Sequence, residues 1–213
     1  MSGGPEALPP EEFRALLGRQ LPRWSLTAPE PGTVGRLAAF LAELDRWRRR
    51  INLTGRLSPG ELVSHALESV LGERFLPPRA RVVDIGTGGG FPGVPLAIWR
   101  PDLEMTWLEP RARRAAFLRH VARAIPVENA RVLEARREVL PEASFGYATS
   151  RAVRIDPRTL RKATFLEPGG ALVLWTASPR DLAPAMALEG LPLEAALAIP
   201  GSRQRAIGVF RKA

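Results

Sequence analysis

The fold is decided by residues 82–93, which read Val82-Val83-Asp84-Ile85-Gly86-Thr87-Gly88-Gly89-Gly90-Phe91-Pro92-Gly93. The apolar start predicts a buried strand, the glycines predict a tight loop, and the apolar run up to Trp99 predicts a helix. Glycines have no side chain to hold a ligand away from the backbone, so a strand, a glycine loop and a helix in this order are typical of a ligand site. The stretch therefore predicts an α/β fold that binds a ligand beyond the end of a strand.

Short apolar runs and helical stretches alternate after residue 81. This alternation predicts βαβ units, and so a parallel sheet covered by helices. Only Pro200-Gly201-Ser202 separate the last two runs, a gap that allows a hairpin but no crossover helix. We therefore expect a mostly parallel seven-stranded sheet ending in an antiparallel hairpin, the Rossmann-like arrangement of class I S-adenosylmethionine (SAM)-dependent methyltransferases. The predicted strands are 82–85, 105–108, 132–133, 147–149, 171–175, 193–199 and 205–210, and the predicted helices are 92–99, 111–124, 157–165 and 181–188.

The first 75 residues carry apolar residues at helical spacing, which predicts helices over 11–21, 34–51 and 59–71. Ser58, Pro59 and Glu61 fit the N-cap, N1 and N3 positions of a capping box at the third helix. Pro77-Pro78 then interrupts the chain. We expect an N-terminal helical extension over 1–75, with residues 1–10 disordered, followed by a SAM-binding core over 76–213.

Composition excludes several kinds of site. The chain has no cysteine, which excludes disulfides, thiolate metal ligands and the cysteine nucleophile of pyrimidine C5 methylation. With only His65 and His120, a histidine-built metal site is unexpected, so we expect no metal. The sequence shows neither a signal-peptide pattern nor an uncharged run long enough to span a bilayer, so we expect a cytoplasmic protein that binds no membrane.

The net charge of +9 is unevenly placed, because 20 of the 31 basic residues but only 13 of the 22 acidic residues follow residue 80. A basic field suits a polyanion such as RNA, since neutralised phosphates release their counterions. However, 29 of the 31 basic residues are arginine, and a general bias toward arginine would give the same charge. Charge alone therefore leaves both alternatives open.

Two acidic positions bear on the identity of the ligand. Gly88-x-Gly90-x-x-Gly93 also fits the dinucleotide pattern, so the glycines do not separate NAD from SAM. Asp84 would repel a pyrophosphate, but it can accept hydrogen bonds from the ammonium of SAM, directly or through water. Glu109 ends the second strand, where an acid can accept both hydroxyls of the ribose of either ligand. Asp84 therefore favours SAM.

Motifs along the chain resemble those of the RsmG (GidB) family. The loop from Gly90 to Ala97 and the later Thr149-Ser150-Arg151-Ala152-Val153 are the most selective of them. The turn over 166–170 and the hairpin over 200–212 resemble the family as well, and the resemblance extends from about Leu44 to the C-terminus. Further matching residues are Asn52-Leu53-Thr54, His65, Glu68-Ser69 and Arg205.

The resemblance implies a SAM-dependent enzyme that methylates N7 of one guanosine in the 530 loop of 16S rRNA, with the rRNA or a small-subunit particle as its partner. N7 already exposes a lone pair, so the reaction needs alignment and desolvation rather than a general base. We predict Arg151 as the catalytic positioning residue, which contacts guanine O6, a phosphate or SAM, with an ion pair to Asp84 or Glu138 as the structural alternative. The predicted SAM ligands are Asp84, Gly86, Gly88, Gly90, Phe91, Glu109, Arg137, Glu138 and Arg151, and the predicted RNA-side residues are Asn52, His65, Arg154 and Arg205.

Three positions depart from the family pattern. Trp175-Thr176-Ala177 stands where Lys-Gly is usual, Arg137 stands where alanine is usual, and Glu68 replaces an aspartate. The alternatives that stay open are a SAM methyltransferase for another RNA, a small molecule or a protein, an NAD oxidoreductase, and a non-catalytic RNA-binding relative. Structural alternatives also stay open for single residues, namely helix packing for His65, capping for Asn52 and a solvated face for most arginines of helix 111–124.

Overall fold

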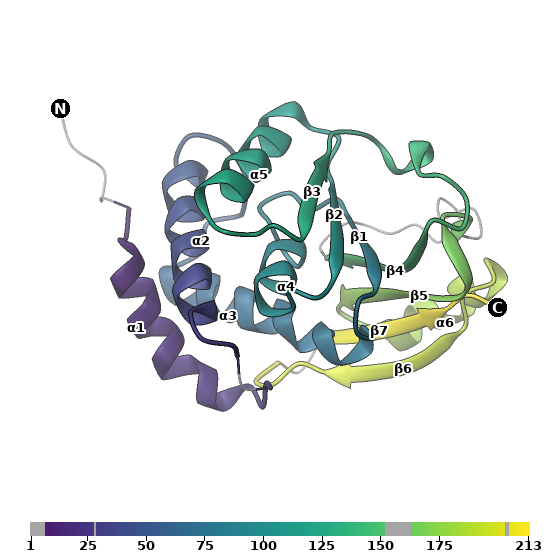
Figure 1. Cartoon of the computed structure of the whole chain (residues 1–213). Coiled ribbons are helices and arrows are strands. Elements are labelled where there is room, and N and C mark those ends of the chain that lie inside the picture. Colours follow the sequence, from purple (N-terminus) through teal and green to yellow (C-terminus); the bar gives the residue numbers. More distant parts are fainter. Residues whose placement is uncertain (1–6, 28, 152–162, 203–204) are drawn as a thin grey trace.

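The computed structural model describes residues 7–27, 29–151, 163–202 and 205–213, and it shows one sheet with helices on both faces (Figure 1). Three helices precede the first strand and lie together beside the sheet: α1 (Pro10–Gln20), α2 (Thr33–Arg48) and α3 (Pro59–Val70). The sheet region contains β1 (Arg81–Ile85), α4 (Gly93–Trp99), β2 (Glu104–Leu108), α5 (Ala112–Ala124), β3 (Ala130–Leu133), β4 (Phe145–Arg151), β5 (Leu166–Thr176), α6 (Pro179–Leu188), β6 (Leu193–Ala198) and β7 (Ala206–Arg211). Short 3-10 turns lie at Leu21–Arg23, Leu71–Phe75 and Arg137–Val139.

The seven strands form one sheet in the order β3-β2-β1-β4-β5-β7-β6. The first five strands pair in parallel, and β7 lies antiparallel between β5 and β6. The predicted mostly parallel sheet with a closing antiparallel hairpin is therefore confirmed. The chain goes to one side of β1 for β2 and β3, and to the other side for β4 and β5. This switch point in strand order places the loop after β1 where open α/β sheets bind their ligands.

The N-terminal helices begin as the local sequence predicts. Ser58 Oγ accepts the Glu61 N–H at 3.3 Å, and Glu61 Oε2 accepts the Ser58 N–H at 2.7 Å, which confirms the capping box of α3. Order begins earlier than expected. Residues 1–6 lie outside the described part, but Pro10 starts α1 and the Leu8 N–H donates to Asp45 Oδ2 at 3.1 Å. A buried carboxylate thus fixes part of the segment for which we expected disorder.

The two faces of the sheet belong to two hydrophobic clusters. Alternate strand residues separate them, so Val82 packs into the first cluster and Val83 into the second. The first cluster contains the apolar faces of α1, α2 and α3 together with α4, α5 and one sheet face. The second cluster contains residues from α6 and the other sheet face. The helical extension and the sheet therefore share one core.

The largest differences from the predicted element boundaries lie at the end of α2 and at the start of β5. Helix α2 ends at Arg48 rather than Ile51. The turn expected at 166–170 is the irregular start of β5, where Gly169 has φ +75° and the pairing with β4 shifts register. A Cβ on Gly170 would lie 2.7 Å from the Gly146 carbonyl oxygen, so glycine permits this bulge.

Two further expectations concern segments rather than boundaries. The helix expected over 157–165 falls mostly outside the described residues. Within the described part, no helix combines the length and the apolar character that a bilayer crossing needs.

Candidate functional site

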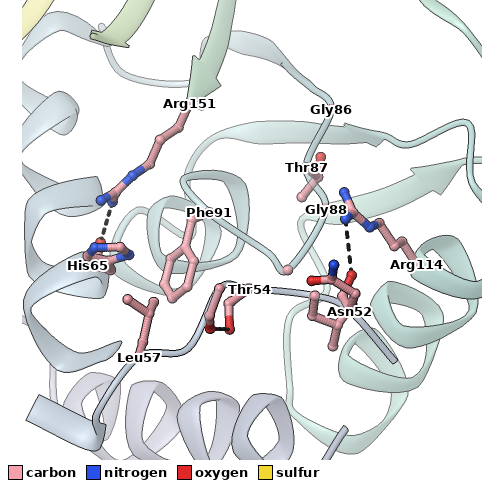
Figure 2. Close-up of a pocket in the computed structure, with 13 residues that line it drawn as sticks. Asn52, Thr54, Leu57, His65, Gly86, Thr87, Gly88, Phe91, Arg114 and Arg151 are labelled. Carbon is pink, nitrogen blue, oxygen red and sulfur yellow. Dashed lines mark hydrogen bonds between the residues drawn. The ribbon is translucent and has the colours of Figure 1, made fainter. Parts of the chain in front are cut away.

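A cavity of about 370 Å³ lies at the carboxyl end of β1, where the glycine loop meets the segment after α2. Gly86, Thr87 and Gly88 line it from the loop, and residues 52–55 line it from the helical extension (Figure 2). Gly86 and Gly88 have φ of +73° and +56°, a region that glycine adopts without strain. The loop therefore presents its backbone to the cavity. The remaining lining residues are Leu57, His65, Gly89, Phe91, Arg114 and Arg151.

The loop glycines serve different purposes. A Cβ on Gly89 would lie 2.8 Å from the Leu53 carbonyl oxygen, so this glycine allows the extension to approach the loop. A Cβ on Gly90 would lie 2.8 Å from the Phe40 ring. Gly90 was predicted as a SAM ligand, but it does not line the cavity, and its missing side chain makes room for packing. At Gly88, by contrast, the nearest atoms of other described residues would lie 3.5 Å from an added Cβ, so the glycine is needed for the positive φ of the turn rather than for space.

Asp84 lies behind the loop rather than at the cavity wall. It is fully buried; its Oδ1 accepts the Thr149 hydroxyl at 2.8 Å and its Oδ2 accepts the Gly93 N–H at 3.1 Å. Burial raises the pKa of Asp84 to about 7, although these hydrogen bonds and one from Thr87 oppose the shift. Asp84 does not line the cavity, and its hydrogen bond with the SAM ammonium, directly or through water, stays a prediction. The carboxylate ties the start of α4 to β4.

Glu109 contacts the cavity wall through Gly88. Its Oε2 accepts the Gly88 N–H at 3.0 Å, its Oε1 accepts the Arg111 N–H at 2.9 Å, and the residue is 3% exposed. Each carboxylate oxygen keeps further lone pairs, so these bonds leave capacity for a ligand hydroxyl. The role of ribose ligand stays a prediction.

Arg151 forms the opposite end of the cavity and is held by α3. Its Nη1 donates to the His65 carbonyl oxygen at 2.9 Å and to Ser69 Oγ at 3.4 Å, and its Nη2 donates to Glu68 Oε2 at 3.0 Å. Arg205 Nη1 donates to the same Glu68 oxygen at 2.7 Å. The acid that pairs with Arg151 is thus Glu68, and not the Asp84 or Glu138 that the sequence suggested. Burial lowers the pKa of Arg151, and the charge of Glu68 opposes that shift.

Phe91 and His65 stand between Arg151 and the rest of the cavity, as Figure 2 shows. The Arg151 guanidinium carbon lies 5.8 Å from the centre of the Phe91 ring, and the His65 ring meets Phe91 edge-on at 5.9 Å. Burial, and then the charges of Arg151 and Arg205, lower the pKa of His65 to about 4. His65 is therefore neutral near pH 7.

Sequence reasoning assigned no site role to Arg114 or to Glu68, although Glu68 was among the residues that resemble the family. Arg114 was grouped with the solvated arginines of α5, but it lines the cavity and its Nη2 donates to the Asn52 carbonyl oxygen at 3.0 Å. Asn52, predicted on the RNA side, lines the cavity beside it. The buried position of Glu68 could have been predicted from the sequence. An acid between Leu67 and Val70 on an apolar helix face indicates a buried ion pair.

Other predicted residues lie away from the cavity. Arg137 pairs with Glu138 at 3.3 Å, the Glu138 side chain is 59% exposed, and neither residue lines the cavity. Arg154 lies outside the described residues. The unusual Trp175 packs against α3, where its Nε1 donates to the Glu68 carbonyl oxygen at 2.8 Å. In the described part of the chain, no three His, Asp or Glu side chains gather in a way that would hold a metal ion.

The sheet order and the glycine loop define the class of protein. A SAM-dependent methyltransferase from Aquifex aeolicus has the same fold, with a TM-score of 0.57 over 68% of this chain and 87% of that chain, at 16% identity. The SAM-dependent methyltransferase SibL matches with a TM-score of 0.60 over 82% of this chain and 74% of that chain, at 15% identity. The protein therefore has the Rossmann-like fold of the SAM-dependent methyltransferases.

Sequence comparison identifies the family within this class. The model of the GidB family, rRNA small subunit methyltransferase G, matches residues 34–178. Ribosomal RNA small subunit methyltransferase G of Xanthomonas axonopodis pv. citri (strain 306) is 38% identical over 170 residues, 78% of each chain. The protein of that name from Stenotrophomonas maltophilia (strain K279a) is 39% identical over 140 residues, 64% of this chain and 66% of that one. The chain belongs to the rRNA small subunit methyltransferase G family.

Proposed function

We propose that the protein transfers a methyl group from SAM to N7 of a guanosine in the 530 loop of 16S rRNA, in the cytoplasm and on rRNA or a small-subunit particle. The observation that carries the proposal is the family membership, since the relatives are named for methylation of small-subunit rRNA. The cavity supports it, because its walls come from both the glycine loop and the helical extension. One wall can hold SAM while the other meets the base.

The residues on the loop side support SAM as the ligand. Gly86 and Gly88 expose backbone at the end of β1, and we assign the ribose hydroxyls to Glu109, whose buried carboxylate accepts the Gly88 N–H. When bound, SAM supplies an electrophilic methyl group on its sulfonium sulfur. We assign Asp84 a supporting role, since its hydrogen bond to Gly93 fixes the end of the loop.

The residues on the other side fit a neutral guanine. N7 needs no deprotonation, so the site has to align the base and exclude water. His65 is neutral and contacts Phe91, which suits packing rather than proton transfer. We assign Arg151 the positioning of the base or its phosphate, because Glu68 and the His65 carbonyl oxygen fix the direction of its guanidinium.

The proposal is tested by mapping 7-methylguanosine. Unmethylated 30S subunits are incubated with the purified protein and SAM, and the RNA is cleaved at 7-methylguanosine with borohydride and aniline. We expect one new cleavage site in the 530 loop, and we expect this site to be absent when SAM is left out. Methylation elsewhere, or of a small molecule only, would overturn the assignment.

Arg151 provides the first mutational prediction. Arg151→Lys keeps the charge but loses the planar fork, so we expect it to slow single-turnover methyl transfer nearly as much as Arg151→Ala. Calorimetric SAM affinity should stay within about threefold, because we assign Arg151 to the base or its phosphate and not to SAM. A tenfold loss would correspond to about 1.4 kcal/mol of lost contact with SAM. A variant that regains the wild-type rate at saturating SAM would show that Arg151 only holds SAM.

A further inference from the structure

A second cavity, of about 470 Å³, adjoins the first on the side of the helical extension. The two cavities share Thr54 and Gly55, so this short segment separates them. The second cavity lies between the end of α2 and the start of α3, and it is not part of the SAM site described above. Its remaining lining residues are Leu8, Asp45, Arg48, Arg49, Arg56 and Pro59.

The lining of this second cavity is strongly basic. It contains three arginines and one acid, Asp45, which is buried. Asp45 Oδ1 accepts from Arg48 Nε at 2.8 Å and Nη2 at 2.6 Å, and its Oδ2 accepts from Arg49 Nη2 at 2.9 Å. Burial raises the pKa of Asp45, but the hydrogen bonds from Arg49 and Arg48 outweigh it, and the pKa is lowered. Asp45 is thus ionised at neutral pH, and the lining keeps two net positive charges.

Arg48 and Arg49 are held in place by Asp45 before any ligand arrives, whereas Arg56 is not. Arg48 Nη1 also donates to the Leu57 carbonyl oxygen at 2.6 Å, so its guanidinium is held on two sides. Arg56 is exposed and makes no hydrogen bond or ion pair within the described residues. It follows Gly55 directly, on the segment that separates the cavities. Planar guanidiniums match the oxygens of a phosphate, and fixed ones lose less entropy on binding.

We propose that this arginine-lined cavity binds a phosphodiester of the RNA strand, next to the nucleotide whose base enters the catalytic cavity. The identity of the RNA rests on the proposed function. The shared Thr54-Gly55 segment supports the placement, because a strand that crosses it has its base on one side and its backbone on the other. Arg56 is the cation that the ligand engages without competition from an internal partner.

The experiment measures RNA binding directly. A fluorescent 16S rRNA fragment that carries the 530 loop is titrated with wild type, Arg56→Ala and Arg56→Glu at several salt concentrations. The matched control is Arg180→Glu, because Arg180 is exposed on α6 over the opposite sheet face and also has no partner within the described residues. We expect Arg56→Glu to weaken binding about tenfold and Arg56→Ala to lower the salt slope by about 1, with melting temperature and SAM affinity unchanged.

Three results would overturn the inference: no RNA binding by the wild type, equal effects of Arg56→Glu and Arg180→Glu, or a parallel loss of SAM affinity. The assay does not depend on methyl transfer. A wild type that binds RNA through Arg56 but does not methylate N7 would therefore overturn the proposed function and leave this site standing.

Discussion

At the scale of single residues, Glu68 organises the side of the cavity that faces away from the glycine loop. Its carboxylate is 1% exposed and accepts hydrogen bonds from Arg151 on β4 and from Arg205, which precedes β7. Its carbonyl oxygen accepts the Trp175 indole N–H from β5. One residue of α3 thus fixes side chains from three other parts of the chain.

We predict that Glu68→Gln separates positioning from SAM binding. The variant keeps the shape but leaves Arg151 buried without a compensating charge, so unfolding free energy should fall by about 2–4 kcal/mol. Single-turnover methyl transfer should slow at least about tenfold, while calorimetric SAM affinity stays within about threefold. Glu68→Asp restores the charge and should recover part of both losses. A Gln variant that transfers methyl groups at the wild-type rate would contradict the role of Glu68.

From the raised pKa of Asp84 we predict that the free energy of unfolding depends on pH. Its folded pKa of about 7 lies above the ordinary value of 3.8, so the folded state binds the extra proton between about pH 4 and pH 7. The contribution of Asp84 to unfolding free energy therefore falls as pH rises through this window, and is lowest above pH 7. In Asp84→Asn the amide oxygen can still accept the Gly93 N–H, and the amide NH2 can donate to the Thr149 hydroxyl, without any titrating group. Its stability relative to wild type should be greater at pH 8 than at pH 5 by about 2–3 kcal/mol, measured by chemical denaturation. A difference that does not change with pH would refute the shifted pKa.

At the scale of elements, the site depends on contact between the glycine loop and the segment after α2. Gly89 makes this contact, because its missing side chain leaves room for the Leu53 carbonyl oxygen and the Thr54 methyl group. The cavity therefore keeps both of its walls only while the glycine loop and the segment after α2 stay in contact.

We predict that Gly89→Ala weakens SAM binding about tenfold. The added Cβ would lie 2.8 Å from the Leu53 oxygen, so the segment has to move away, and overpacking should cost about 1–3 kcal/mol of stability. The control is Gly35→Ala in α2, where the added Cβ would have no neighbour within 4 Å among the described residues apart from the adjoining backbone of its own helix. That variant should bind SAM like wild type and be stabilised by about 0.5–1 kcal/mol. Equal SAM affinities of the two variants would contradict the contact.

At the scale of the whole molecule, the helical extension belongs to the folding unit of the sheet. Phe40 of α2 meets Phe91 of the glycine loop with ring centres 5.6 Å apart, and Trp47 meets Phe117 of α5 at 5.7 Å. Both contacts lie in the cluster that also contains Val82 of β1. Removal of the extension would expose this face of the sheet and one wall of the cavity.

We predict that residues 76–213 alone do not form a fixed tertiary structure. The exposed apolar face of the sheet and its helices would favour aggregation or a loosely packed state without a near-UV circular dichroism signal. The full chain should instead unfold in a single transition by both near-UV and far-UV signals. A fragment that unfolds cooperatively and binds SAM would show that the extension is a separate domain.

The sequence by itself determined the elements and their order. The strand, glycine loop and helix around Asp84, the capping box at Ser58 and the closing hairpin all depend on residues that are near one another in the chain. These elements can be predicted because hydrophobic periodicity, glycines and capping residues determine structure within a few neighbouring residues of the chain. The glycine loop also indicated which end of the sheet carries the ligand site, and the family motifs indicated the reaction.

Only the tertiary structure decided which side chains meet. Glu68 and Arg205 are 137 residues apart, and Arg114 reaches Asn52 across 62 residues. Periodicity places a residue on a face of its own element, but the distance to another element depends on how the whole core packs. For that reason Asp84 was expected at the cavity and lies behind it. The cavity lined by Arg56 could not be predicted at all, because it exists only where the ends of two helices and the segment between them come together.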